Sequence, residues 1–386
     1  MRIGFLFNHY AAHQVPHAAP FAFELSRIRP DFEIVIACST NKERAMVETI
    51  GCLYPGHRCT VMRLSLSPTQ WLIDKVKSRW KLKRKRFILE RNLDFFRSLD
   101  ALVTPERNAL KLRSRFGLSD LKMIHTRHGA GDREGGFDER CADFDFTLLP
   151  GQKYVDGLRE QGFLGAHAMV GWPKFEVMQK LKPKRERFFR NDNPTVVYAP
   201  HFDERVSSWQ TMGEAVLDFF AANTDYNLIV APHVVLFTRS KRHGARMPKG
   251  YGRKPNILID KGSDRSADMT YMRAADIYLG DASSQVYEFL SEPRPCIFLN
   301  AQGVAWKDDP HYRHFTLGQV VDDVSDGLKP ALDRAFSSRA DFRRQQEDAF
   351  AYTFHIEAGS TAAERGAAAL AGFFQSVAAT DHRSAA

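Results

Sequence analysis

The sequence has no apolar run that approaches the length of a membrane-spanning helix, and Met1–Phe7 leads directly into an expected strand without a signal-peptide pattern. Internal repeats and low-complexity segments are also absent. The five cysteines are odd in number and scattered, without CxxC or zinc-ligand spacing. These absences argue against a disulfide framework and a structural metal, and they predict a soluble or peripheral protein of a reducing cytosol. The cysteines are Cys38, Cys52, Cys59, Cys141 and Cys296.

The chain is long and carries a net positive charge. With 386 residues and 44% hydrophobic content it is too long for one core, and two domains of ordinary size are expected. The net charge of +9 indicates anionic partners. Composition alone leaves open whether these are nucleotides, lipid surfaces or nucleic acid.

Short apolar segments alternate with amphipathic helical patterns, which is typical of parallel sheets covered by helices on both faces. The first series of expected strands is Ile3–Phe7, Glu33–Cys38, Thr60–Leu64, Ala101–Thr104, Met123–Thr126, Thr147–Leu149 and Ala168–Gly171. The second is Val196–Ala199, Asn227–Ala231, Asn256–Ile259, Asp276–Leu279 and Cys296–Leu299. The sequence therefore predicts an α/β fold of two Rossmann-like, doubly wound domains facing a central cleft, with ligands at the carboxyl ends of the strands.

A polar, basic and proline-bracketed stretch between Lys180 and Pro194 suits a linker between the two domains. We accordingly expect an N-terminal acceptor domain over residues 1–180 and a nucleotide-donor domain over residues 194–338. A helical segment over 339–375 and a disordered tail over 376–386 complete the expected organisation.

The segment Asp276–Leu290 combines a buried strand, a two-hydroxyl turn and a helix. Ser283 and Ser284 fall at the expected helix N-terminus, where free backbone N–H groups and the helix dipole favour a phosphate. Glu288 follows one turn later, and its carboxylate could accept hydrogen bonds from a ribose diol. The alternative is that Ser283 only caps a helix of the core.

Other loops after expected strands carry groups suited to phosphate or proton chemistry. His128 and Gly129 follow one strand of the first series, where a histidine can act as a base near neutral pH. His201 and Arg205 lie in a polar cluster after the strand at Val196–Ala199, and His233 follows the next strand. His233 could neutralise a diphosphate, and the cluster with His201 and Arg205 could hold phosphate or acceptor or simply be solvated. The alternative for His128 is a turn histidine that bonds within its own loop.

Taken together, these segments resemble the CDP-glycerol glycerophosphotransferases of the teichoic-acid polymerase type. The resemblance covers roughly Met123–Asn300 and rests on the His128-Gly129 turn, on Tyr198-Ala199-Pro200, on Pro232-His233, and on Asp281-Ala282-Ser283-Ser284 followed by Arg294-Pro295. It implies a glycosyltransferase-B fold, with His128 as the base, His233 at the donor phosphate and the paired serines as the phosphate-binding turn. The chain departs from the family at Glu288, where the family commonly has aspartate, and in the residues that follow Pro200 and Ala231.

The first domain is then expected to hold the acceptor, with His13 and His17 after the first strand as candidate contacts. The alternative is that these histidines pack beneath their loop. A basic helical pattern further along the domain suits an anionic membrane surface, or else a solvated helix. Its candidate membrane-binding residues are Trp80, Lys81, Lys83, Arg84, Lys85 and Arg86. Nucleic acid is not an expected partner, because no recognition module or set of interleaved stacking aromatics is present.

The sequence predicts a cytoplasmic transferase, peripherally bound at the inner face of the cell membrane and acting in cell-envelope biosynthesis. It would move a glycerophosphate-like group from a nucleotide diphosphate donor, CDP-glycerol being the expected one, to a hydroxyl of a lipid-linked or saccharide acceptor. CMP would leave. No cofactor or metal is expected, because no Asp-x-Asp motif stands at a strand end. The alternatives are a nucleotide-sugar glycosyltransferase of the same fold and a non-catalytic binder of anionic envelope polymer or lipid.

Overall fold

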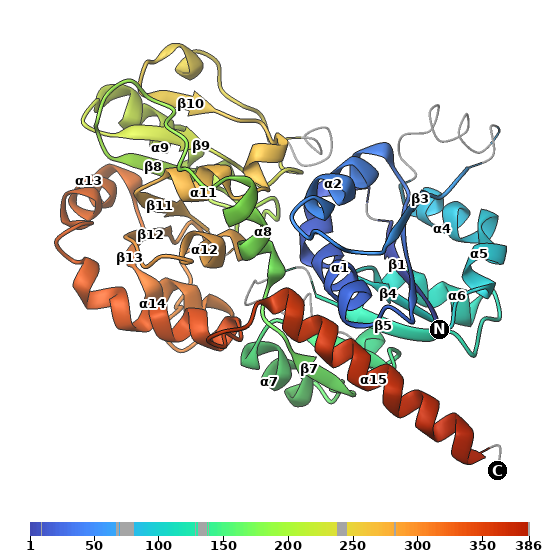
Figure 1. Ribbon diagram of the computed structural model, residues 1–386. Helices are drawn as coiled ribbons and strands as arrows, with labels where there is room; N and C mark the ends of the chain where they lie inside the picture. The colour runs from blue at the N-terminus through green and yellow to red at the C-terminus, as the bar shows by residue number, and fades with distance from the viewer. Residues whose placement is uncertain are drawn as a thin grey trace. The chain divides into compact units, whose positions relative to one another are not determined.

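The computed structural model describes residues 1–8, 10–66, 69, 81–127, 129, 137, 139–237, 245–281 and 283–384 (Figure 1). The described residues form two compact units. Unit 1 contains those of Met1–His128, Gly135–Leu181 and Tyr352–Ala386, and unit 2 contains those of Gly129–Glu134 and Lys182–Ala351. Each unit is built on its own parallel sheet.

Unit 1 has a seven-stranded parallel sheet with the order β3-β2-β1-β4-β5-β6-β7. Its strands are β1 (Arg2–Phe7), β2 (Glu33–Cys38), β3 (Thr60–Arg63), β4 (Ala101–Thr104), β5 (Lys122–Thr126), β6 (Phe146–Leu149) and β7 (His167–Met169). The central strands read as continuous apolar runs because both faces of the sheet are covered. The strand order reverses between β1 and β4, so the carboxyl ends of these two strands border the position where such sheets bind ligands.

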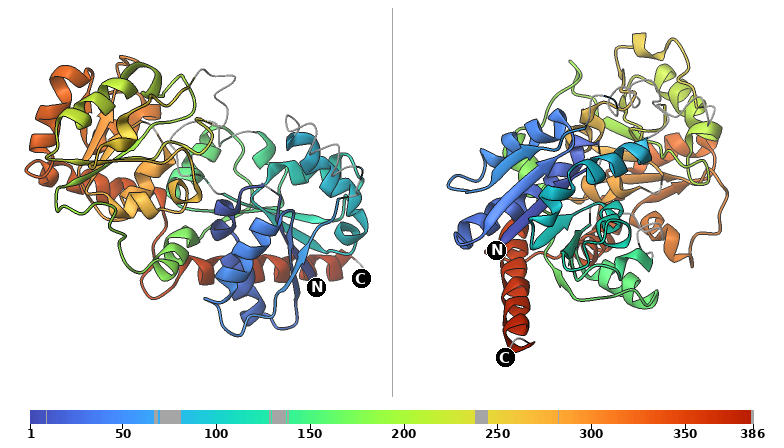
Figure 2. Two further views of the ribbon diagram at one scale, coloured as in Figure 1. Left: turned by 90° about the horizontal axis from the view of Figure 1, so that it is seen from above. Right: turned by 90° about the vertical axis from the view of Figure 1, so that its right-hand side faces the viewer.

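The helices of unit 1 cover this sheet. They are η1 (Ala12–His17), α1 (Ala19–Ile28), α2 (Asn41–Gly51), α4 (Lys81–Arg91), α5 (Leu93–Arg97), η2 (Arg107–Leu110), α6 (Lys111–Ser114), η4 (Glu139–Cys141), α7 (Gln152–Glu160), α8 (Pro173–Leu181) and α15 (Ala362–Ser384). Helix α2 begins with a reciprocal capping box between Thr40 and Glu43. The last helix, α15, packs along α1 at the other end of the chain and runs as one uninterrupted helix (Figure 2).

Unit 2 has a six-stranded parallel sheet with the order β10-β9-β8-β11-β12-β13. Its strands are β8 (Thr195–Ala199), β9 (Asn227–Val230), β10 (Ile257–Ile259), β11 (Ile277–Gly280), β12 (Cys296–Leu299) and β13 (Gln319–Val321). Its helices are α9 (Trp209–Ala222), η5 (Tyr251–Arg253), η6 (Asp264–Ser266), α11 (Thr270–Ala274), α12 (Ser284–Phe289), η7 (Pro310–Leu317), α13 (Val324–Arg334) and α14 (Arg339–Thr353), whose last two residues belong to unit 1. Apolar side chains of α9 and α13 pack with the inner strands into the main core of this unit.

Every strand expected from the sequence is present, and one was not expected. Strand β13 is three residues long and only Val321 is buried in it, so it lacks the apolar run that marks the others. The segment expected as a disordered tail at 376–386 is helical in its described part, because α15 continues to Ser384. The sequence has alanine but no glycine or proline from Ser376 to Ser384, and such a segment extends a helix that is already nucleated.

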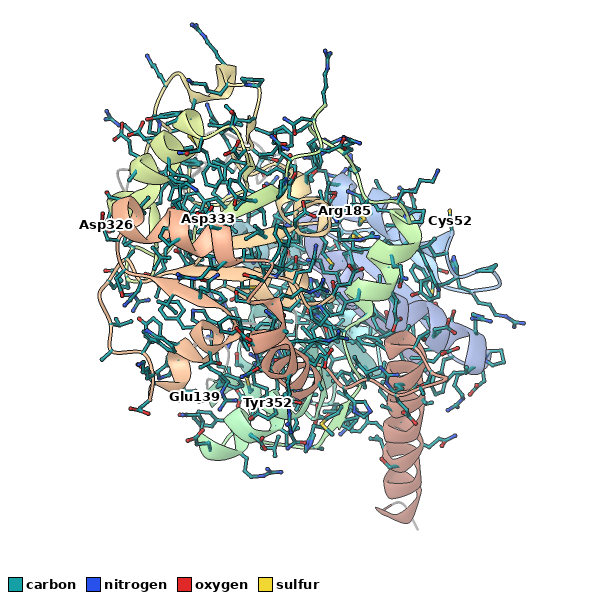
Figure 3. The ribbon with its side chains drawn as sticks, turned by 90° about the vertical axis from the view of Figure 1, so that its left-hand side faces the viewer. Cys52, Glu139, Arg185, Asp326, Asp333 and Tyr352 are labelled. Carbon is teal, nitrogen blue, oxygen red and sulfur yellow. The ribbon has the colours of Figure 1, made fainter. Side chains whose placement is uncertain are left out.

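The stretch expected to link the two domains belongs to unit 2 from Lys182 onward and is bonded to it. Lys182 forms an ion pair with Asp268. The guanidinium of Arg185, labelled in Figure 3, donates to the Ala274 carbonyl and to the Asp276 carboxylate at 2.7 Å each. The C-terminal helical segment is also divided, because the boundary between the units falls between Ala351 and Tyr352.

Candidate functional site

The candidate site of unit 2 begins where β8 and β11 end side by side. These parallel strands pair with Gly280 opposite Ala199, and the strand order of the sheet reverses between them. Gly280 has a φ of +155°, and a Cβ at this position would lie 2.9 Å from the Ala199 carbonyl oxygen. Glycine therefore allows the two strand ends to approach, and the loops that follow them start from neighbouring points at the switch point of the sheet.

Asp281 ties these two loops together. Its Oδ2 accepts the backbone N–H of His201 at 2.8 Å and that of Ser208 at 2.9 Å. Asp281 is only 1% exposed. Burial raises the pKa of Asp281 to about 7, against the hydrogen bonds from Ser208 and His201, which lower it. Asp281 belongs to the turn that carries the resemblance and is a predicted donor-binding residue, and in the structure its carboxylate joins the loops that follow β8 and β11.

His201 and His233 are brought together at this edge, and both rings lie close to Phe202. The two imidazole centroids are 5.6 Å apart, and each lies 4.5 Å from the Phe202 ring. His201 Nδ1 accepts the backbone N–H of Asp203 at 3.1 Å, and His233 Nδ1 accepts that of Val235 at 3.3 Å. A backbone N–H can only donate, so Nδ1 is unprotonated and each neutral ring carries its proton on Nε2. The site thus has two imidazole N–H donors, which suit anionic oxygens.

The turn after β11 leads into α12 as expected, but the helix is short. Ser283 is its N-cap, with Oγ accepting the Gln285 N–H at 3.3 Å. The side chain of Ser284 lies outside the described residues. With six residues, α12 has a smaller dipole than a helix of ordinary length, so its N-terminus attracts an anion less strongly.

Buried Arg294 fixes the far end of α12. It donates to the carbonyls of Phe289 and Ala275, the latter at 2.7 Å, and its guanidinium lies 3.9 Å from the centre of the Phe289 ring. Burial lowers its pKa to about 10. A cation at the C-terminal end of a helix is favourable, and this position explains the Arg294-Pro295 pair as support for the turn rather than as a ligand contact.

Two further predicted donor-binding residues are less well placed for that role. Glu288 is 5% exposed, so its carboxylate is covered by protein. Arg205 has a side chain that is 78% exposed and forms a bidentate pair with Asp203, at 3.0 Å and 2.6 Å. Its charge is already matched by that carboxylate, which reduces its attraction for a phosphate.

The predicted base, His128, lies outside the described residues. The preceding residue, Arg127, has its guanidinium 5.0 Å from the Phe137 ring and 4.9 Å from the Tyr154 ring. These cation–π contacts fix the chain at the end of β5. At Gly129 a Cβ would meet no described atom within 4 Å, so the structure gives no steric reason for glycine there.

The predicted acceptor-binding histidines lie in η1, directly after β1. His13 is half-buried, whereas His17 is 3% exposed and its ring centroid is 4.7 Å from that of Trp172. His17 therefore has the packing role that the sequence left open as the alternative. A residue that the sequence reasoning missed, Glu43, accepts the N–H groups of Tyr10 and Thr40 at 2.8 Å and 2.9 Å.

Glu43 thereby organises the loop after β1 while it completes the cap of α2. Tyr10 has a positive φ of 61° within this loop, and its N–H is the one that Glu43 holds. Burial raises the pKa of Glu43, against hydrogen bonds that lower it. The Thr-x-x-Glu spacing at Thr40 signalled the cap, but not the contact with a loop more than 30 residues earlier.

The basic helix α4 is engaged with its own unit. Lys85 is paired with Glu106, and both side chains are largely buried. Arg84 lies 4.6 Å from the centre of the Tyr10 ring, and Arg86 lies 5.3 Å from that of Phe87. These three residues are half-buried rather than a free cationic face. Trp80 and the side chains of Lys81 and Lys83 lie outside the described residues.

No described helix has the length and apolar content needed to cross a membrane. In the same residues, no group of three or more histidine, cysteine, aspartate or glutamate side chains is arranged to hold a metal ion.

No protein-family model matches the sequence, and no curated protein matches it. Solved structures do resemble it. A candidate UDP-N-acetylglucosamine 2-epimerase from Listeria monocytogenes matches with a TM-score of 0.61 at 15% identity, covering 97% of both chains. The wall teichoic acid polymerase TagF matches with a TM-score of 0.60 at 10% identity, covering 97% of this chain and 90% of TagF.

MnaA from S. aureus, in a structure with UDP, matches with a TM-score of 0.58 at 12% identity, covering 91% of this chain and 92% of MnaA. At these identities the likeness concerns the fold. It confirms the prediction of an α/β protein with two parallel sheets of the glycosyltransferase-B type.

Proposed function

We propose that this protein is a transferase that uses a nucleoside-diphosphate-linked donor, held by the loops at the carboxyl ends of β8, β9 and β11. The finer proposal is transfer of a glycerophosphate-like group from CDP-glycerol to a hydroxyl of a lipid-linked or saccharide acceptor, with release of CMP. The observation that carries it is the pair of imidazole N–H donors at His201 and His233, beside the Ser283 turn at the switch point.

The chemistry needs only groups of this chain. An acceptor hydroxyl attacks the distal phosphorus of the donor, a new P–O bond forms, and the bridging P–O bond to CMP breaks. The hydroxyl proton passes to a base, for which we propose His128 from its position after β5. The Nε2–H groups of His201 and His233, with the Ser283 hydroxyl, would stabilise negative charge on the phosphates.

Support for the donor class comes from sequence and fold together. The Asp281-Ala282-Ser283-Ser284 turn, Arg294-Pro295 and the Pro232-His233 turn resemble the glycerophosphotransferases, and the solved relatives include TagF soaked with CDPG. A peripheral membrane location and a lipid-linked acceptor belong to the same proposal. The half-buried residues of α4 do not add to it, so membrane attachment would rest on Trp80 and its neighbours.

A second candidate is favoured by the UDP-related structures among the relatives. In this reaction a UDP-linked sugar is the donor, attack occurs at the sugar carbon, and UDP leaves. A third outcome, epimerisation of the sugar without nucleotide release, is consistent with the same relatives. Binding of an envelope polymer without any turnover is the non-enzymatic alternative.

The decisive experiment incubates the full chain with CDP-glycerol or with UDP-N-acetylglucosamine, in each case with a lipid extract as acceptor source. Released nucleotides are resolved by chromatography, and the remaining sugar nucleotide is analysed for epimerisation. Release of CMP that depends on the extract supports the proposal. Release of UDP, or conversion of the sugar without release, replaces it with the corresponding alternative. No turnover with either donor, despite saturable binding of the polymer, favours the binding protein.

A further inference from the structure

The loop that follows β10 lies at the same edge of the unit 2 sheet as the loops that carry His201, His233 and Ser283. Strand β10 pairs in parallel with β9, so the two strands end together and their loops start side by side (Figure 1). The loop after β10 begins at Asp260 and continues through η6 to the start of α11. It is therefore the neighbour of the turn that holds His233.

Asp260 fixes the first turn of this loop. Its Oδ1 accepts the backbone N–H groups of Gly262 and Ser263 at 2.8 Å and 2.7 Å, and its Oδ2 accepts the Ser263 hydroxyl. Asp260 is 8% exposed. Burial acts to raise the pKa of Asp260, but the hydrogen bonds from Ser263 and neighbouring groups hold it below its ordinary value. The carboxylate is therefore ionised at neutral pH, in the form that accepts hydrogen bonds most strongly.

The other end of the loop is bonded to α12. The side-chain amide of Gln285, in the first turn of that helix, donates to the Ser266 carbonyl at 2.7 Å. Both residues are buried. The backbone N–H of the same Gln285 donates to the Ser283 hydroxyl. The loop after β10 is thus fixed at both ends, and its second attachment is to the turn at Ser283.

Between these two attachments the loop contacts the turn of His233. Gly262 has a φ of +103°, and a Cβ at this position would lie 3.0 Å from both the Cα and the carbonyl oxygen of Val234. Glycine is required here by the backbone conformation and by the close approach. Val234 directly follows His233, and the next N–H, that of Val235, is the one that His233 Nδ1 accepts. The place of Gly262 therefore limits where the backbone of the His233 turn can lie.

The loop after β8 holds the same turn from its other side. The backbone N–H of His233 donates to the Pro200 carbonyl at 3.0 Å, and the N–H of Leu236 donates to the His233 carbonyl at 2.9 Å. Strand β9 is placed between β8 and β10 in the sheet, so the turn after it is bordered by both loops. The orientation of the His233 ring thus depends on the loop after β10 as well as on its own turn.

We propose that Asp260 is a positioning residue for His233. By fixing the loop after β10 against Val234, Asp260 keeps the Nε2–H of His233 directed at the donor phosphates without contacting the donor itself. This inference rests on the proposed function, in which His233 stabilises charge on those phosphates. Displacement of such a group by about 1 Å can lower a rate by as much as about 10²-fold.

Two variants of the full chain disturb the same contact by different means. Asp260→Ala removes the acceptor of the two N–H groups, whereas Gly262→Ala leaves Asp260 in place and puts a Cβ against Val234. Both should lower kcat/KM roughly tenfold or more, measured by nucleotide release with the donor that proves active. Asp260→Asn should keep most of the native activity, because its amide oxygen can accept the same two N–H groups.

Heteronuclear NMR of the histidine ring nitrogens reports on His233 without any turnover. The native chain should show a neutral His233 ring with its proton on Nε2, identified by the signals that disappear in His233→Asn. Asp260→Ala and Gly262→Ala should shift these signals toward a mixture of the two tautomers, because the Val235 N–H is then displaced from Nδ1. The signals of His167 in unit 1 should not change. Changed His233 signals with native turnover would support the positioning of the ring and overturn the role of His233 in the proposed reaction.

The controls match both changes within unit 2. Gly250→Ala imposes the same backbone strain at a φ of +102°, but a Cβ there meets no described atom within 4 Å. Asp323→Ala also removes a carboxylate that accepts two backbone N–H groups, at the start of α13. Both controls should keep the native kcat/KM and the native His233 signals.

Unchanged His233 signals in Gly262→Ala overturn the proposal, as do equal changes in the control variants. Gly262→Ala keeps the test valid if melting temperatures show that Asp260→Ala is unstable. A double variant separates action through His233 from a general loss of structure. Adding Gly262→Ala to His233→Asn should lower kcat/KM no further, and a further tenfold fall would show that the loop after β10 does not act through His233.

Discussion

Asp281 links the protonation of one buried carboxyl group to the stability of unit 2. Its pKa is raised by burial from 3.8 to about 7, which corresponds to roughly 4 kcal/mol. The folded chain therefore binds this proton more tightly than the unfolded chain. The associated stability is present below about pH 4 and is lost as the pH rises toward 7.

The substitution Asp281→Asn tests this link, because an amide oxygen can still accept the N–H groups of His201 and Ser208 without a charge. We expect the drop in melting temperature between pH 5 and pH 8 to be smaller in this variant than in the native chain. Asp333→Asn, on the surface of α13, is the control and should keep the native drop. An unchanged drop in Asp281→Asn would show that this group does not titrate in the expected range.

The substitution His233→Asn distinguishes the role of His233 in its own turn from its proposed role at the donor phosphates. The amide oxygen can accept the Val235 N–H in place of Nδ1, while the Nε2–H donor is lost. If His233 stabilises charge on the donor phosphates, kcat/KM should fall by roughly 10²–10³ with little change in melting temperature. The fall is measured by nucleotide release with the donor that proves active. His167→Asn in unit 1 should keep native activity, and full activity of His233→Asn would remove this residue from the mechanism.

At the scale of single residues, the sequence predicted those parts of the site that depend on neighbouring residues in the chain, but not contacts between residues far apart in it. His201, His233 and Ser283 each follow a strand that could be read from its apolar run, so their meeting at one sheet edge was predictable. The role of Asp281 was not, because its partners Ser208 and His201 are 73 and 80 residues away. The pairing of Lys85 with Glu106 was not predicted for the same reason, because the two residues are far apart in the sequence.

At the scale of elements, α12 depends on Arg294 for its position. Arg294→Met keeps much of the side-chain volume but leaves the Phe289 and Ala275 carbonyls without this donor. We expect a loss of about 1–3 kcal/mol per unsatisfied carbonyl, together with faster hydrogen exchange of the α12 amides. Arg339→Met is the control, since exposed Arg339 also donates to a carbonyl, that of Pro293 at 2.8 Å. Equal exchange of α12 in the two variants would contradict the supporting role of Arg294.

The elements themselves were largely predictable because both sheets are parallel and covered, which turns each inner strand into an apolar run bounded by polar turns. Strand β13 was not predicted, because it is defined by its pairing with β12 and not by a run of buried residues. The division of the C-terminal helices between the two units was not predicted either. It depends on tertiary contacts such as those of Gln346, which donates to the Arg294 and Leu317 carbonyls at 2.9 Å and 2.7 Å in unit 2.

At the scale of the whole molecule, the attachment of α15 to unit 1 is open to test at one glycine. A side chain at Gly366 would overlap the Phe21 ring of α1, whereas a Cβ at Gly372, on the same helix, meets no atom within 4 Å. Gly366→Leu should therefore lower the melting transition of unit 1 and leave that of unit 2 in place, as followed by calorimetry. Gly372→Leu should keep both transitions. A shift of the unit 2 transition in Gly366→Leu would contradict the assignment of α15 to unit 1.

The last segment also contacts parts of unit 1 other than α1. Tyr352, labelled in Figure 3, donates to the Asp156 carboxylate at 3.0 Å, and Arg365 donates to the Val170 carbonyl at 3.2 Å. Unit 1 thus needs residues from both ends of the chain, while nearly all of unit 2 is one continuous segment. During synthesis on the ribosome, unit 2 can acquire its full set of contacts first. The domain whose translation begins earliest must wait for the final helix, with the face of α1 that awaits α15 open to chaperones in the interval.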